Sequence, residues 1–163
     1  MDDAASLLEI EAIKQLKARY CRYLDTKDWL MWRGIFIDDF LSDTSQAGGT
    51  VIRGADEFVA FTRRGVGERA TAHQVHAPEI ELTSATTARG IWALEDVVRL
   101  APGVNLRGYG HYHETYEKVD GQWRITSSKL TRLREDIFNA FVSVYLSDRI
   151  KKAAGRAARL LVR

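Results

Sequence analysis

The feature that most constrains the fold is a change in apolar periodicity at Thr71. Before this residue, apolar side chains recur at helical spacing, and after it they alternate with other residues, as in β-strands. Helices followed by strands favour an α+β fold, in which the helices cover one face of a strongly curved sheet. The dipeptides Pro102-Gly103 and Asp120-Gly121 mark tight turns, so the long strands are expected to form an antiparallel meander.

Three helices are expected in the first part of the chain, over residues 6–24, 29–37 and 55–64. Ser6 and Glu9 have the spacing of a capping box, which supports a helix start at Ser6. Asp28 is a good N-cap for the second helix. If Asp28 has that role, Asp25 is left without an obvious local function at the end of the first helix.

Six strands are expected, two short ones followed by four long ones. They are predicted over residues 40–43, 50–53, 71–82, 88–99, 106–119 and 123–133. Pro78 has no backbone N–H and should interrupt the third of them with a bulge or bend. Residues 135–163 return to helix-like spacing and are expected to form a basic C-terminal helical tail.

Length and composition indicate one domain over residues 1–163, with a core of about residues 6–134 and the tail 135–163. The chain has 163 residues, of which 45% are hydrophobic, and a net charge of +2. So small a charge gives no reason to expect a nucleic-acid partner. No apolar run reaches the length of a membrane span, no signal peptide is recognisable, and Cys21 is the only cysteine. A cytoplasmic location with no membrane association is therefore expected.

Four residues could carry chemistry on the inner side of such a fold. Tyr20 lies on the buried face of the first helix, Asp25 follows it at the helix end, and His73 lies on a strand. A carboxylate that orients a histidine makes that histidine a general base. Asp96 belongs to an otherwise apolar or small strand face, where burial would raise its pKa. Each of these residues could instead be an ordinary core or turn residue.

His111 and His113 share one side of the next strand, and Tyr112, Glu114 and Tyr116 share the other. At most one of these sets can face a cavity, and the sequence does not decide which. A metal site is not expected, because the chain has no HExxH motif and no Cys/His pairing.

Two segments resemble SnoaL-like proteins of the nuclear transport factor 2-like superfamily: residues 10–29, from Ile10 to Asp25 and on to Asp28-Trp29, and residues 110–125, with their tyrosines and Asp-Gly-x-Trp hairpin. The pattern is most similar to the group of scytalone dehydratase, bile-acid 7-alpha-dehydratase and hexachlorocyclohexane dehydrochlorinase. The resemblance implies a cystatin-like cone, a curved and mostly antiparallel sheet packed on three N-terminal helices. It also implies a deep apolar pocket and homodimers or homotrimers.

The resemblance further implies an elimination reaction without metal or organic cofactor. His73 and Asp25 match the dyad of the group, and Tyr20 matches its dehydratase members. Asp96 and His111 would assist. Ser128 stands where the dehydrochlorinase has an arginine, and Arg132 lies too far along the chain to be taken as its substitute. The aromatic side chains expected to enclose a small apolar or multi-ring substrate are Trp29, Trp32, Phe36, Phe58 and Trp92.

The leading hypothesis is a cofactor-independent lyase of the dehydratase type, or an isomerase, that acts on an apolar cyclic hydroxy-carbonyl compound. Two alternatives remain open. The first is a non-catalytic protein that binds a small molecule, and the second is a structural subunit like the small subunit of ring-hydroxylating dioxygenases. A His73–Asp25 contact at an open cavity would favour the enzyme.

Overall fold

The structure is a computed structural model that describes residues 3–145 and residue 150. The helices are α1 (Asp3–Asp25), α2 (Trp29–Arg33) and α3 (Ala55–Val66), with a short 3₁₀ helix at Ser45–Ala47. The strands are β1 (Phe36–Asp43), β2 (Val51–Arg53), β3 (Thr71–Leu82), β4 (Thr87–Ala101), β5 (Val104–Val119), β6 (Gln122–Phe138) and β7 (Ser143–Tyr145). The expected α+β fold with three N-terminal helices is confirmed.

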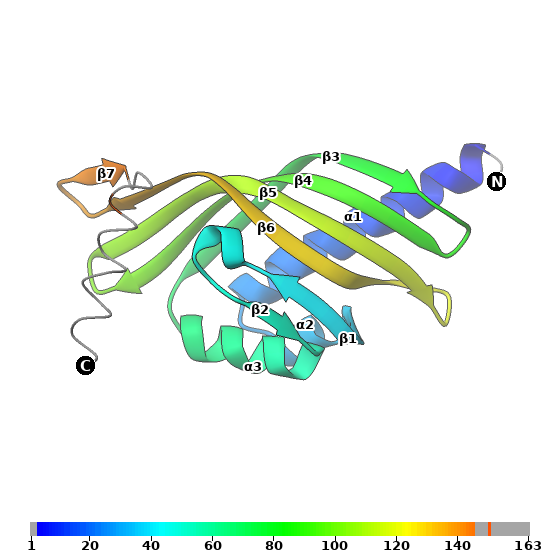
Figure 1. Ribbon diagram of the computed structural model, residues 1–163, viewed down its shortest axis with the longest axis horizontal. Helices are drawn as coiled ribbons and strands as arrows, with labels where there is room; N and C mark the ends of the chain where they lie inside the picture. Colours follow the sequence, from blue (N-terminus) through cyan, green and yellow to red (C-terminus); the bar gives the residue numbers. More distant parts are fainter. Residues whose placement is uncertain (1–2, 146–149, 151–163) are drawn as a thin grey trace.

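One sheet contains all of these strands, in the order β2-β1-β6-β5-β4-β3, with β7 paired to β6. Its neighbouring strands are antiparallel except for β1 and β6, which are parallel. Figure 1 shows the long strands arching over α1, with α2 and α3 lying below β1 and β2. The curved, mostly antiparallel sheet packed on helices is therefore the cone that the sequence predicted.

The core lies between the inner face of the sheet and α1. Ile13, Leu16, Tyr20 and Leu24 of α1 are buried, as their helical spacing predicts. On β4 the buried residues alternate with more exposed ones, and the buried set contains the predicted inner residues, Gly90, Trp92, Leu94 and Asp96. The inner face is therefore apolar except at a few positions, and those positions form the site described below.

The register of β3 breaks where the sequence predicted it. The pairing with β4 shifts between His76 and Glu79, and Ala77 has a positive φ of 45°. Pro78, which lies inside this irregularity, cannot donate a hydrogen bond to the sheet. The bend leaves Thr71 and His73 in regular pairing with β4 on one side of the break.

Several predicted boundaries are wrong. The first helix begins at Asp3, so Ser6 lies inside it instead of at its start, and β1 begins at Phe36 instead of residue 40. The second helix ends at Arg33 instead of residue 37, because Phe36 already pairs in parallel with Ile125 of β6. The helical tail predicted from residue 135 is wrong over residues 135–145: β6 continues to Phe138, and β7 follows. Apart from residue 150, the rest of the predicted tail, residues 146–163, lies outside the described residues.

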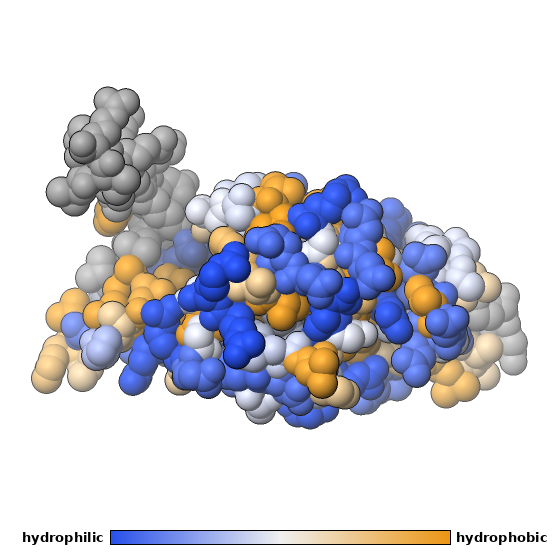
Figure 2. Space-filling model, turned by 90° about the horizontal axis from the view of Figure 1, so that it is seen from below, coloured by the Kyte–Doolittle hydropathy of each residue, from blue (hydrophilic) through white to orange (hydrophobic). Residues whose placement is uncertain are grey.

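Among the described residues, no helix is long and apolar enough to cross a membrane. The face that carries α3, seen from below, is mostly hydrophilic with separate hydrophobic spots (Figure 2). Hydrophobic side chains gather more densely at the end that carries β7, where Phe141 and Val142 are exposed.

Candidate active site

The turn after α1 leaves one carboxylate free for long-range contacts. Asp28 caps α2, as predicted, because its Oδ1 accepts the backbone N–H of Met31 at 3.2 Å. Lys27 has a positive φ of 62° and lets the chain reverse between the two helices. Asp25, the last residue of α1, is thus not needed for capping and points to β3.

Asp25 and His73 form the predicted dyad. The Asp25 Oδ1 atom lies 2.7 Å from His73 Nδ1, and Oδ2 accepts the His73 backbone N–H at 2.7 Å. The Thr71 hydroxyl donates to Oδ1 at 2.8 Å, and itself accepts a hydrogen bond from the Lys27 ammonium at 2.7 Å. These bonds hold the carboxylate at both oxygens and fix the orientation of the imidazole.

The electrostatics of the dyad favour an ionised aspartate. Burial alone would raise the pKa of Asp25, but the hydrogen bonds and charge of His73 outweigh it, so this pKa lies below its ordinary value. An ionised carboxylate can only accept, so Nδ1 carries the proton and donates it to Asp25. The other ring nitrogen, Nε2, is then left as a proton acceptor.

A second polar pair continues the site across the sheet. His73 on β3 is directly opposite Asp96 on β4, so both side chains project from the same face. The Asp96 Oδ2 atom accepts a hydrogen bond from Arg132 Nη2 at 2.7 Å. The two side chains are only 3% and 8% exposed. Asp96 is thus buried, and its partner is the arginine that the sequence analysis had discounted.

Gly108 on β5 makes room for this pair. Gly108 lies opposite Asp96, and a Cβ atom there would overlap both Asp96 Oδ1 and Arg132 Nη1. Arg132 reaches this place because the pairing of β6 with β5 shifts next to it, leaving Leu133 unpaired and exposed. Arg132 is therefore aimed inward by a bulge, which the spacing of the sequence does not reveal.

The Asp96–Arg132 pair has buried polar atoms that lack a hydrogen-bond partner among the described residues. Asp96 Oδ1 and Arg132 Nη1 are buried and make no hydrogen bond within the described part of the chain. Burial opposes the charge of Arg132, but Asp96 raises the pKa of the guanidinium above its ordinary value. Unmet donors and acceptors of this kind are unfavourable in a core and are available for hydrogen bonds to a polar ligand.

Tyr20 is buried close enough to Asp96 to be influenced by its charge. Its ring packs edge-on against Trp32, Phe36 and Tyr112, with ring centroids 5.5–6.0 Å apart. Burial raises the pKa of the Tyr20 hydroxyl well above its ordinary value, and the charge of Asp96 adds to the shift. The hydroxyl is therefore a neutral hydrogen-bond donor on the inner side of the sheet.

A pocket of about 490 Å³ opens beside the dyad, between α1 and β3. Its lining includes His73, Trp92, Cys21 and Lys14. Trp92 is thus the only one of the five predicted wall residues that lines this pocket. Trp29, Trp32, Phe36 and Phe58 instead pack against one another.

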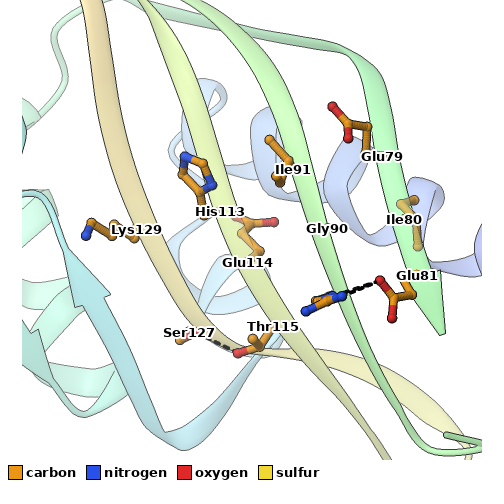
Figure 3. A pocket seen from close by; sticks show the side chains of 11 residues that line it. Glu79, Ile80, Glu81, Gly90, Ile91, His113, Glu114, Thr115, Ser127 and Lys129 are labelled. Carbon is orange, nitrogen blue, oxygen red and sulfur yellow. Dashed lines mark hydrogen bonds and ion pairs between the residues drawn. The ribbon is translucent and has the colours of Figure 1, made fainter. Parts of the chain in front are cut away.

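His111 is not brought to the site. On β5 the buried side contains Tyr112, Glu114 and Tyr116, so His111 and His113 project from the opposite, outer face. His113 Nε2 lies 3.1 Å from the Thr131 hydroxyl. Figure 3 shows the groove on this outer face, with His113 between Lys129 and Ile91. The assisting role assigned to His111 is therefore not supported by its position.

The sequence analysis also missed a buried ion pair. Lys17 Nζ lies 2.6 Å from Glu114 Oε1, and both side chains are 0% exposed. Lys17 lies one turn after Ile13 and one turn before Tyr20, so a charged residue on the apolar stripe of α1 was the available signal. No group of three or more His, Cys, Asp or Glu residues that could hold a metal ion occurs among the described residues.

A curved, mostly antiparallel sheet packed on three N-terminal helices is the fold of the nuclear transport factor 2-like superfamily. The chain belongs to the SnoaL-like domain family, whose profile matches residues 5–129.

Named relatives agree with this assignment. The probable cyclase FGR4 of Gibberella zeae is 28% identical over 133 residues, which cover 74% of this chain and 89% of the relative. Rv3472 of Mycobacterium tuberculosis, a protein of unknown function, superposes with a TM-score of 0.72 at 27% identity, covering 82% of this chain and 77% of the other. A hexachlorocyclohexane dehydrochlorinase, LinA type 2, has the same fold, with a TM-score of 0.73 at 18% identity and coverage of 90% and 95%.

Proposed function

We propose that this protein is a cofactor-independent lyase or isomerase that removes a proton from carbon next to a carbonyl group. The observation that carries the proposal is the 2.7 Å contact between Asp25 Oδ1 and His73 Nδ1. An imidazole held by an ionised carboxylate is a general base whose cationic form is stabilised. The pocket beside His73 gives a substrate a route to it.

The reaction proposed is the loss of water from an apolar cyclic hydroxy-carbonyl compound. His73 Nε2 takes the proton from carbon, and the C–H electrons form a C=C bond as the C–O bond of the neighbouring carbon breaks. Tyr20 donates its proton to the departing hydroxyl, which leaves as water. His73 then loses its extra proton to solvent and Tyr20 regains one from solvent, which restores both groups. In the isomerase form, the proton returns from His73 to a different carbon, and nothing leaves.

The Asp96–Arg132 pair would hold the carbonyl oxygen of the substrate. Arg132 Nη1 is a buried donor without a partner among the described residues, and the pair lies on the same face as His73. A donor preorganised where negative charge develops stabilises an enolate-like transition state. The relative named a probable cyclase supports small-molecule chemistry for this family.

The test is turnover of a panel of hydroxy-ketone polyketides and steroids, followed as loss of water by mass spectrometry. His73→Ala is expected to lower the rate by about 100-fold to 10,000-fold, the usual contribution of a general base. Asp25→Asn should cause a loss of the same order, because the amide cannot stabilise the imidazolium. His111→Ala, on the outer face, is the matched control and should retain full turnover.

Full turnover by His73→Ala would show that the base assignment is wrong. A protein that turns over no member of the panel, yet binds one with an affinity unchanged by His73→Ala and Asp25→Asn, would be a non-catalytic small-molecule binder.

A further inference from the structure

The buried ion pair lies against the proposed acid. Lys17 Nζ is 4.0 Å from the centroid of the Tyr20 ring and 3.7 Å from the centroid of the Tyr112 ring. A cation on the face of an aromatic ring is attracted by the electrons of the ring, and the attraction is stronger away from water. Because the Lys17 side chain is 0% exposed, the contact of its ammonium with both rings is shielded from water.

Glu114 is held in place by a chain of hydrogen bonds. Its Oε2 accepts from the Tyr116 hydroxyl at 2.6 Å, and Oε1 accepts from the Ser128 hydroxyl at 3.1 Å. The Tyr116 hydroxyl in turn accepts from Trp92 Nε1 at 2.7 Å. The carboxylate thus fixes the ammonium from the side of the sheet.

Stability alone does not explain such a pair. The cost of removing two charges from water commonly offsets their attraction, so apolar residues of similar volume often serve a core equally well. The pair does, however, place a positive charge directly on a hydroxyl-bearing ring that the proposed reaction uses. Lys17 makes the ring contact, and Glu114 makes contact with Lys17.

We propose that Lys17 is a positioning residue that fixes the Tyr20 ring and makes its hydroxyl a stronger acid than burial among carboxylates would otherwise allow. The inference rests on the proposed role of Tyr20 as the donor to the leaving group. It extends the site beyond the dyad to a group that never touches the substrate.

Burial and the other groups around Tyr20 together favour its neutral form. Glu114 on β5, Asp96 on β4 and Cys21 on α1 each oppose a negative charge on Tyr20 and raise its pKa, as burial does, whereas the Tyr112 hydroxyl lowers it. A cation in contact with the ring acts in the direction opposite to the carboxylates, because it stabilises the developing phenolate.

The experiment measures the acidity of position 20 directly and needs no substrate. Tyr20 is replaced with 3,5-difluorotyrosine, whose fluorines make the hydroxyl more acidic, and its ionisation is followed by ¹⁹F NMR against pH. The main variant, Lys17→Met/Glu114→Gln, removes both charges together, so no lone charge is left buried. Lys14→Met, one turn earlier and exposed, is the matched control.

The double variant and the single variant Glu114→Gln differ only in the Lys17 charge. The double variant is therefore expected to have the higher titration midpoint at position 20, by about one pH unit or more, a tenfold fall in the acid dissociation constant. Lys14→Met should have the midpoint of the wild type. A midpoint in the double variant that is equal to or lower than that of Glu114→Gln would overturn the inference.

Comparison of Glu114→Gln with the wild type gives a second check. Loss of the carboxylate should lower the midpoint, because Lys17 then acts on Tyr20 without opposition. A midpoint in Glu114→Gln that is equal to or higher than that of the wild type would contradict the inference. The titration does not involve His73, so its failure is distinguishable from failure of the turnover test.

Discussion

Three pairs of an acidic and a basic side chain connect α1 with the sheet in the described part of the chain, and two of them differ in almost every physical respect. Asp25 pairs with a histidine at the end of the helix, next to an open pocket. Glu114 pairs with Lys17 in the middle of the helix, where neither side chain reaches solvent. His73 in the first pair keeps a ring nitrogen, Nε2, that can accept a proton, whereas Lys17 and Glu114 are fully enclosed by the protein.

The difference indicates that the two pairs have different roles. A group that must accept and release a proton needs access to substrate and a partner that tolerates both states. A group that acts only through its electric field has the largest effect when it is fixed in place and shielded from water, because water weakens electrostatic interactions. The Asp25–His73 pair meets the first requirement, and the Lys17–Glu114 pair meets the second.

The largest expected effect on stability comes from removing the charge of Lys17. Lys17→Met leaves Glu114 buried without its cation and should lower the free energy of unfolding by about 3–5 kcal/mol. Lys17→Met/Glu114→Gln should recover most of that loss, because no unpaired charge remains. Urea denaturation of the three proteins measures the difference. Equal stability of the single variant and the wild type would show that the pair is not charged in the folded protein.

Asp25 and His73 were candidates from the sequence, and their pairing as a dyad was implied by the resemblance to SnoaL-like proteins, whereas the buried pair was not recognised. Asp25 was identified because Asp28 already explains the helix cap, and His73 because strand alternation places it on a defined face. Lys17 lies on the same apolar stripe as Tyr20, yet charged residues on a helix are usually solvated. Only the position of Glu114, far along the chain, explains why Lys17 is buried.

The remaining errors have the same origin in non-local pairing. Local spacing suggested a helix at Ile137 and Phe138, but both residues pair with the beginning of β5. Arg132 was discounted by counting residues, and the bulge beside it changes which side chains face inward. The glycines at positions 108 and 110 were a usable signal, since both lie where a side chain would strike β6 residues.

Gly108 tests the second polar pair with a smaller change. In Gly108→Ala the new methyl group would overlap Asp96 Oδ1 and Arg132 Nη1, so the pair must move. We expect a loss of about 1–3 kcal/mol, the usual effect of overpacking. Gly65→Ala in α3 is the matched control, because its Cβ would meet nothing within 4 Å. If both variants unfold at the same urea concentration, the close packing around Gly108 is wrong.

The smallest expected effect is the pH dependence that the dyad adds to stability. The pKa of Asp25 is lower in the folded protein than in the unfolded chain, where it is about 3.9. Its contribution is therefore fully present above that unfolded value and is lost as the pH falls through the folded value. Asp25→Asn has no such group, so the gap in unfolding free energy between wild type and variant should narrow from pH 7 to about pH 3. Glu114→Gln cannot serve as the comparison, because that change leaves the Lys17 ammonium buried without its carboxylate. Denaturation curves for wild type and Asp25→Asn that stay the same distance apart over this range would mean that folding leaves the pKa of Asp25 unchanged, and the hydrogen bonds to His73 and Thr71 would then contribute no preference for the carboxylate.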